Sequence, residues 1–105
     1  MTVRTLRSEA APKYRLRFLL QEFNLPFGIT IIGRADDCQV TLFDPSVSRQ
    51  HARIIVDDRC AIIEDLKSRN GVWLNGTRVY QAVLQQGDAL RLGATDLIYE
   101  ILFSA

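Results

Sequence analysis

The sequence is divided into short apolar or β-branched runs, each bounded by residues that favour turns. The pattern is clearest over residues 14–20, where apolar side chains recur at every second position, at Leu16, Phe18 and Leu20. A period of two is that of a strand with one buried face. Such units, separated by turn signals roughly every 6 to 15 positions, predict an all-β sandwich.

The remaining runs support the same fold class. They are residues 29–32, 39–42, 51–56, 60–64, 72–74, 89–92 and 97–103. Turn signals such as Asn70-Gly71 and Asn75-Gly76 separate them. No window of about 11 or more residues shows helical periodicity without an interrupting Gly or Pro, which disfavours a helix bundle or a βαβ fold.

Length and charge limit the classes of function. The chain has 105 residues, 48% of them hydrophobic, which suits one domain with its own core. Residues 1–13 have little apolar content and are predicted to be a flexible tail, so the domain occupies residues 14–105. Because 13 basic side chains face 12 acidic ones, no overall field favours nucleic acid or an anionic membrane.

The cysteines favour a cytoplasmic location, and the lack of a long apolar run argues against a membrane partner. Cys38 and Cys60 lie far apart, without the spacing of a zinc or redox motif, and no signal peptide precedes them. We expect reduced, partly buried thiols in a cytoplasmic protein, with a disulfide as the alternative. No apolar run approaches the roughly 18 residues that cross a bilayer, so we expect no membrane partner.

Residues that usually carry catalysis or hold metals are sparse. His51 is the single histidine, and no cysteine lies near it in sequence. A nucleophilic triad or a metal site would need partners that the sequence does not indicate. We therefore expect a protein that is not an enzyme and that needs no metal or cofactor.

Polar residues gather instead in three connections between predicted strands, at residues 33–37, 45–51 and 67–71. Loops at one end of a rigid sandwich are where binding usually occurs. We therefore expect a binding site built from these three loops.

Five motifs stand in a fixed order along the chain. They are Ile32-Gly33-Arg34, Ser48-Arg49-Gln50-His51, Ser68-Arg69-Asn70-Gly71, Val72-Trp73-Leu74-Asn75-Gly76 and Leu92-Gly93. Over about residues 14 to 103 this order resembles that of forkhead-associated (FHA) domains. The resemblance implies two antiparallel sheets with about eleven short strands, whose loops at one end bind a phosphothreonine peptide. It also implies phosphorylation-dependent signalling in a bacterial Ser/Thr kinase pathway, with the kinase or its substrate as partner.

The resemblance implies roles for individual loop residues. Arg34 matches the phosphate clamp, since a guanidinium can offer a phosphate two charge-assisted hydrogen bonds. Ser48 is expected to donate to the same phosphate through its hydroxyl or backbone amide, and Asn70 to hold the main chain of the ligand. Arg49 matches a position that contacts phosphate or peptide. Arg69 stands where relatives often carry Ser or Thr, and its charge is a further candidate contact.

Other motif residues are expected to serve the fold or to set specificity. His51 is expected to tie loops together through its ring nitrogens. Ser46 matches a position that selects side chains C-terminal to the phosphothreonine, and a small neutral serine predicts no strong acidic preference there. The remaining structural positions are Gly33, Gly71, Asn75 and Gly76.

Simpler interpretations stand beside these. Arg34 would be an ordinary surface charge if it were paired with Asp36 or Asp37. Asn70-Gly71 is also the strongest hairpin signal in the chain.

Other functions also remain open for the whole domain. A sandwich that has lost phosphate binding and serves only as a protein-interaction scaffold would show an exposed apolar patch instead of a basic depression. Nucleic-acid binding is supported only by Arg15 and Arg17, without interleaved aromatic residues. Self-recognition is a third alternative, because Thr2 and Thr5 could be phosphorylated in the predicted tail.

Overall fold

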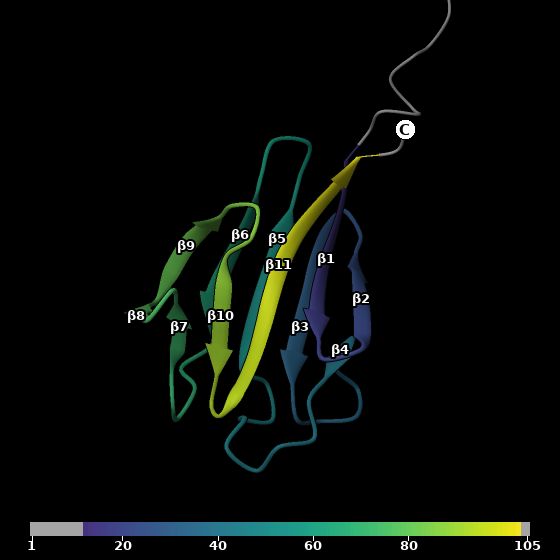
Figure 1. Ribbon diagram of the computed structural model, residues 1–105. Coiled ribbons are helices and arrows are strands. Elements are labelled where there is room, and N and C mark those ends of the chain that lie inside the picture. Colours follow the sequence, from purple (N-terminus) through teal and green to yellow (C-terminus); the bar gives the residue numbers. More distant parts are fainter. Residues whose placement is uncertain (1–11, 104–105) are drawn as a thin grey trace, which may run out of the picture.

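The structure is a computed structural model that describes residues 12–103, and within that range it contains eleven strands and no helix. The strands form two sheets that pack face to face (Figure 1). Their bounds are β1 Pro12–Phe18, β2 Gln21–Leu25, β3 Gly28–Gly33, β4 Val40–Thr41, β5 Ala52–Val56, β6 Ala61–Asp65, β7 Val72–Leu74, β8 Thr77–Val79, β9 Gln81–Leu84, β10 Ala89–Leu92 and β11 Thr95–Phe103. The predicted all-β sandwich is confirmed.

The sheets mix elements from distant parts of the chain. One has six strands in the order β2-β1-β11-β10-β7-β8, and the other has five in the order β4-β3-β5-β6-β9. Neighbours are antiparallel except β3 and β4, which pair in parallel over two residues each. The first and last described strands, β1 and β11, pair side by side inside the larger sheet (Figure 1).

Alternating apolar residues from both sheets fill the core. In β5 every second residue is buried, with Ala52, Ile54 and Val56 facing inward. The six-stranded sheet contributes Leu16 of β1 and Leu97 and Tyr99 of β11 to the core, and all three are fully buried. Burying each large apolar side chain contributes about 1.5–3 kcal/mol, so this two-sided pattern stabilises the sandwich.

Three strands are absent from the sequence prediction: β2, β8 and β9. Each lies at an edge of a sheet, where one side has no strand neighbour. Their side chains are mostly exposed, and β8 contains no fully buried residue. Edge strands are held mainly by backbone pairing, so they carry little of the apolar alternation that identifies a central strand.

The predicted alternation over residues 14–20 is wrong at its end. β1 stops at Phe18, and Leu19 and Leu20 form the turn into β2. Leu19 has a φ of 55°, and Leu20, predicted on the buried face, is fully exposed. The chain reverses here without the Gly, Asn or Asp that usually marks a turn, so no local residue signals the reversal.

The first described strand starts slightly before the predicted domain, and both cysteines are free. β1 begins at Pro12, two residues before the predicted start, while Thr2, Thr5 and the rest of the predicted tail through residue 11 lie outside the described residues. Cys38 and Cys60 are both free, as predicted. Burial and the nearby Asp37 raise the pKa of the Cys38 thiol, which donates a hydrogen bond to the Arg49 carbonyl at 3.3 Å.

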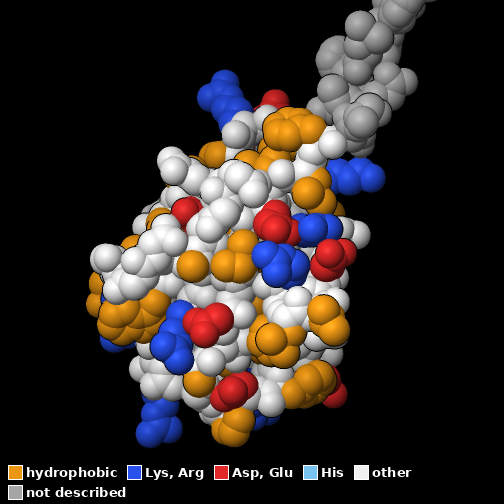
Figure 2. All heavy atoms as spheres, in the orientation of Figure 1, with side chains coloured by type: hydrophobic (Ala, Val, Ile, Leu, Met, Phe, Trp, Pro, Cys, Tyr) orange, Lys and Arg blue, Asp and Glu red, His pale blue; other side chains and the backbone are white. Residues whose placement is uncertain are grey.

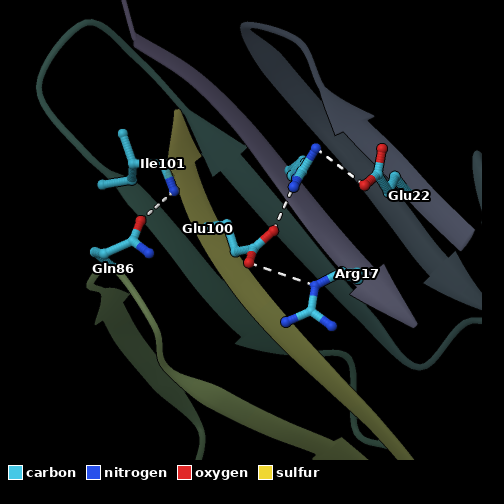
Figure 3. Close-up of polar contacts among 6 residues, drawn as sticks. Arg17, Glu22, Gln86, Glu100 and Ile101 are labelled. Atoms are coloured by element: carbon cyan, nitrogen blue, oxygen red, sulfur yellow. Dashed lines mark hydrogen bonds and ion pairs between the residues drawn. The ribbon is translucent and has the colours of Figure 1, made fainter. Parts of the chain in front are cut away.

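The arginines of β1 belong to an ion-pair network on the outer face of the larger sheet (Figure 3). The Arg15 Nε donates to Glu100 at 2.8 Å, and Arg17 approaches the second oxygen of the same carboxylate at 3.4 Å. Arg15 also pairs with Glu22 at 3.1 Å. Figure 2 shows basic and acidic side chains next to one another over this face. These charges are therefore compensated and do not form a basic surface for nucleic acid.

The network predicts a pH-dependent contribution to stability. Hydrogen bonding from Arg15, with the charge of Arg17, lowers the pKa of Glu100. A depressed folded-state pKa stabilises the fold above the unfolded value of about 4.3, and this contribution is lost as pH falls through the folded pKa. Glu100→Gln should therefore lower the free energy of unfolding at pH 7 by at most about 1 kcal/mol, because the group is partly exposed.

Urea unfolding of wild type and Glu100→Gln at pH 7 and near pH 3 checks this prediction. The matched control is Asp96→Asn, since Asp96 faces Arg91 at a longer 3.6 Å and both side chains are more exposed. We expect no measurable change in that control. A Glu100→Gln difference that persists unchanged at low pH would contradict the ionic explanation.

Candidate functional site

The three predicted polar loops lie together at the end of the sandwich drawn at the bottom of Figure 1. They are the β3–β4 connection (34–39), the β4–β5 connection (42–51) and the β6–β7 connection (66–71). The tight turn between β10 and β11 joins them, because the Ala94 N–H donates to the Ser46 hydroxyl at 2.7 Å.

His51 is the buried connection between two of these loops. Its Nδ1 accepts the Ser48 N–H at 3.0 Å, so the ring proton is on Nε2, which donates to the Gly71 carbonyl at 2.8 Å. The side chain is completely buried. Its backbone adds two further bonds, from its N–H to the Ile32 carbonyl and from Leu66 to its own carbonyl, both at 2.9 Å. This is the geometry expected of a residue that ties loops together.

Arg34 is held where β3 runs beside the segment before β5. The Arg34 N–H donates to the Ser48 carbonyl at 3.0 Å, and a Cβ at Gly33 would overlap the Arg49 carbonyl, so only glycine permits this approach. The Arg34 Nε donates to the Val47 carbonyl at 3.0 Å. This bond fixes the side chain and leaves both terminal nitrogens for a ligand.

Ser48 differs from expectation in one respect. Its backbone N–H is taken by the His51 ring, so it is not free for phosphate. Its hydroxyl oxygen accepts the Arg69 N–H at 3.1 Å, which leaves the hydroxyl proton available as a donor. The Arg49 N–H has no hydrogen-bond partner within residues 12–103. It is therefore a further free donor, which the sequence analysis did not predict.

Asn70 is anchored but keeps hydrogen-bonding capacity. One proton of its Nδ2 goes to the Ser46 carbonyl at 2.7 Å, which leaves the second proton and Oδ1 for a ligand's main chain. The Trp73 Nε1 donates to the Asn70 carbonyl at 3.1 Å and holds the backbone from the other side.

The hairpin interpretation of Asn70-Gly71 is wrong. β6 and β7, which flank this dipeptide, belong to different sheets, so the segment crosses between sheets. Gly71 has the positive φ that the signal indicates, at 82°. The crossing is braced by Asp65, which accepts the Ser68 N–H at 3.0 Å, and by the Ser68 hydroxyl, which accepts the Gly71 N–H at 2.9 Å.

Ser46 is more constrained than a small surface residue. Its hydroxyl donates to the Asp44 carboxylate at 2.6 Å while accepting the Ala94 N–H. The hydrogen bonds that the Ser46 hydroxyl and backbone N–H donate to Asp44 lower the pKa of that carboxyl. Ser46 therefore fastens the β4–β5 loop to the β10–β11 turn, and its hydroxyl is already engaged on both sides.

Asn75 and Gly76 lie away from the loops that carry Arg34 and Ser48. They form the two-residue turn between β7 and β8, with φ of 49° and 88°. Both angles are positive, as a type I′ hairpin turn requires. The Asn75 Oδ1 accepts the Ala89 N–H at 2.9 Å, which links this turn to β10.

The loops enclose a depression of about 210 Å³. Pro45 and Val47 line it together with all six residues that the sequence predicted for binding or specificity. Those six are Arg34, Ser46, Ser48, Arg49, Arg69 and Asn70.

The depression is locally basic although the chain is almost neutral. Arg34, Arg49 and Arg69 are exposed, and no carboxylate is among the lining residues. None of the ion pairs within residues 12–103 involves any of the three. The expected alternative, in which Arg34 pairs with Asp36 or Asp37, is therefore not found. Uncompensated guanidinium groups beside a free hydroxyl proton suit an anion with several oxygens.

Other features of the described chain give no competing site of this kind. Residues 12–103 contain no cluster of three or more His, Cys, Asp or Glu side chains arranged to hold a metal. The same range has no helix able to span a bilayer. A larger hollow of about 520 Å³ lies beside Trp73 and Arg91, but it contains none of the predicted binding residues.

Comparison with known proteins identifies the family. The FHA domain profile matches residues 30–93, which contain the three polar loops. The chain therefore belongs to the FHA domain family, as its motifs suggested.

Two relatives come from Mycobacterium tuberculosis. FHA domain-containing protein FhaA is 41% identical over 76 residues, which are 72% of this chain and 14% of that protein. Glycogen accumulation regulator GarA is 34% identical over 88 residues, or 84% of this chain and 51% of that protein. The chain thus spans about half or less of the length of these relatives.

Solved structures agree with the fold. A domain from a structural and functional study of phosphothreonine-dependent FHA domain interactions has a TM-score of 0.81 and 35% identity, over 84% of this chain and 95% of that one. The FhaA FHA domain, complexed with the intracellular domain of Rv3910, has a TM-score of 0.80 and 36% identity, over 83% and 99%.

Proposed function

We propose that this domain is a recognition module, without a reaction of its own, that binds peptides carrying phosphothreonine. The observation that carries the proposal is the group of three arginines around one depression, none of them neutralised by a carboxylate within the described chain. A phosphate carries about −1.5 to −2 charges at neutral pH and three acceptor oxygens, which matches that donor set.

The donors divide between phosphate and peptide. In the proposed complex the two terminal nitrogens of Arg34 and the Ser48 hydroxyl bind phosphate oxygens, and the Arg49 N–H is a further donor. Asn70 binds the main chain through its free Oδ1 and remaining amide proton. Arg69 adds charge attraction at the rim. Ser46 is neutral and its hydroxyl is engaged internally, so it offers neither charge nor a free hydroxyl proton to a neighbouring ligand residue.

The energy of these contacts sets the expected selectivity. A hydrogen bond to a charged group contributes about 1.5–3 kcal/mol. Two or three of them distinguish phosphorylated from plain peptide by a hundredfold or more, since about 1.4 kcal/mol is tenfold in Kd.

The partner we propose is a protein phosphorylated on threonine in a bacterial Ser/Thr kinase pathway, either the kinase or its substrate, in the cytoplasm. Support comes from the mycobacterial relatives and from the solved domain studied for phosphothreonine-dependent interactions. A preference for threonine over serine would require a niche for the threonine methyl, as the family resemblance implies.

Binding of the purified domain to a degenerate peptide library with fixed phosphothreonine tests this function, beside matched phosphoserine and unphosphorylated libraries. We expect binding to phosphothreonine, weaker binding to phosphoserine, and a loss of at least about a hundredfold without phosphate. Equal affinity for the first two would contradict the threonine preference. No binding by a folded domain would favour the scaffold alternative.

A further inference from the structure

An exposed aromatic side chain stands beside the basic depression. Phe43 follows β4 in the β4–β5 connection, and 83% of its surface is exposed. Its neighbour Leu42 is buried at 3% exposure, and the Leu42 N–H donates to the Gly33 carbonyl at 2.9 Å. Since Leu42 is fixed inward, the ring of Phe43 is held outward on a backbone that is already ordered.

Phe43 lines a hollow that continues from the basic depression. This hollow, of about 510 Å³, is formed by Phe43, Pro45 and Arg34. Arg34 and Pro45 also line the basic depression, so the two hollows share a wall. Arg34 can serve both, because its aliphatic stem is apolar while its guanidinium is held by the Val47 carbonyl.

The surface continues beyond Phe43. A further hollow of about 260 Å³ is lined by Phe43 together with Phe18 and Thr95, among others. Three hollows linked by shared lining residues thus run from Asn70 past Arg34 to Phe43 and Phe18. An extended peptide advances about 3.3 Å per residue, so a ligand anchored by its phosphate would carry its flanking side chains along such a path.

We propose that Phe43 and Pro45 form an apolar subsite that selects phosphothreonine peptides with an aliphatic or aromatic side chain flanking the phosphothreonine. This inference rests on the proposed function and adds a specificity to it. The phosphate contacts supply the affinity that all phosphothreonine ligands share. The apolar contact makes the Kd lower for peptides with an apolar flanking residue than for those without one. Because the backbone beside Phe43 is already held by the Leu42 N–H, binding has to order only the side chain.

The test begins with the phosphothreonine library, read at positions on both sides of the fixed residue. Wild type should enrich apolar residues at one flanking position. We then measure Kd for the preferred peptide and for the same peptide with serine at that position. Wild type should bind the apolar peptide about tenfold more tightly, and Phe43→Ala should reduce this ratio to below about threefold while leaving the serine peptide within about twofold.

The matched control is Phe27→Ala. Phe27 is 68% exposed in the turn between β2 and β3, at the end of the sandwich opposite the site, so its loss should leave the tenfold ratio intact. Thermal unfolding of both variants confirms that each is folded. Because Phe43 is exposed, its removal should change the Tm by no more than a few degrees.

Each other outcome overturns the inference in a distinguishable way. Selective phosphothreonine binding without an apolar preference, or with a preference that survives Phe43→Ala, overturns the subsite alone. Wild type sedimenting as a dimer and Phe43→Ala as a monomer, with peptide ratios unchanged, would assign the surface to a second copy of the chain. Failure to bind any phosphothreonine peptide overturns both the subsite and the proposed function.

Discussion

Replacing Arg34 with alanine is expected to reduce affinity for a phosphothreonine peptide by at least about a hundredfold. In the proposed complex the variant would lose two charge-assisted hydrogen bonds to phosphate, each contributing about 1.5–3 kcal/mol. The fold should suffer little, since the side chain is exposed and its one bond within the domain, from Nε to the Val47 carbonyl, is worth about 1 kcal/mol. Isothermal titration calorimetry and thermal unfolding measure the two effects separately.

Two further variants make the Arg34 result specific. Arg34→Lys keeps the positive charge but loses the paired donors and the Val47 contact, so it should recover only a small part of the affinity. Arg59→Ala removes an exposed arginine from the β5–β6 turn at the other end of the sandwich, and should bind as wild type does. Equal losses in Arg34→Ala and Arg59→Ala would mean that overall charge, rather than this site, attracts the ligand.

Replacing His51 with alanine is expected to give a large loss of stability, about 3–5 kcal/mol. Two loops lose their shared partner, and the Ser48 N–H and the Gly71 carbonyl are left without it. The fully buried ring also leaves a cavity. For a domain of this size such a loss lowers the Tm by roughly 15 °C or more. Chemical denaturation at pH 7 gives the free energy directly.

The matched control for His51 is its neighbour Gln50, which is exposed. Gln50→Ala should change the free energy of unfolding by less than about 0.5 kcal/mol. Because His51 places Ser48, the His51→Ala domain should also bind phosphopeptide more weakly at temperatures where it is still folded. A His51→Ala variant as stable as Gln50→Ala would show that the loops are held by other contacts.

The fold could be predicted from sequence where strands bury one face. β5 and β10 alternate between core and surface, and the predicted runs match them within one residue. The edge strands β2, β8 and β9 could not be predicted, because backbone pairing with a single neighbour leaves no apolar pattern. Leu19 and Leu20 show the reverse error, since apolar residues that continue a pattern can stand in an exposed turn.

The sequence could also predict which loop residues gather around one depression, because they belong to motifs in a recognisable order. What sequence could not give was the use of each hydrogen-bonding group. The Ser48 amide is committed to His51, and the Ser46 hydroxyl to Asp44 and Ala94. These hydrogen bonds depend on which loops contact one another, which is a property of the tertiary structure. For the same reason the sequence does not show that Phe43 is exposed beside Arg34.

The most direct test of the account is an NMR titration of the ¹⁵N-labelled domain with one phosphothreonine peptide and its unphosphorylated counterpart. The phosphopeptide is predicted to shift the backbone amides of Ser48, Arg49, Arg69 and Asn70 and the Nε–H of Arg34 most strongly. Amides away from the site, around Phe27 in the β2–β3 turn and Asn75 in the β7–β8 turn, should stay in place. The plain peptide should shift none at the same concentration. Shifts centred on the Trp73 hollow, or equal shifts from both peptides, would contradict a phosphate site at these loops.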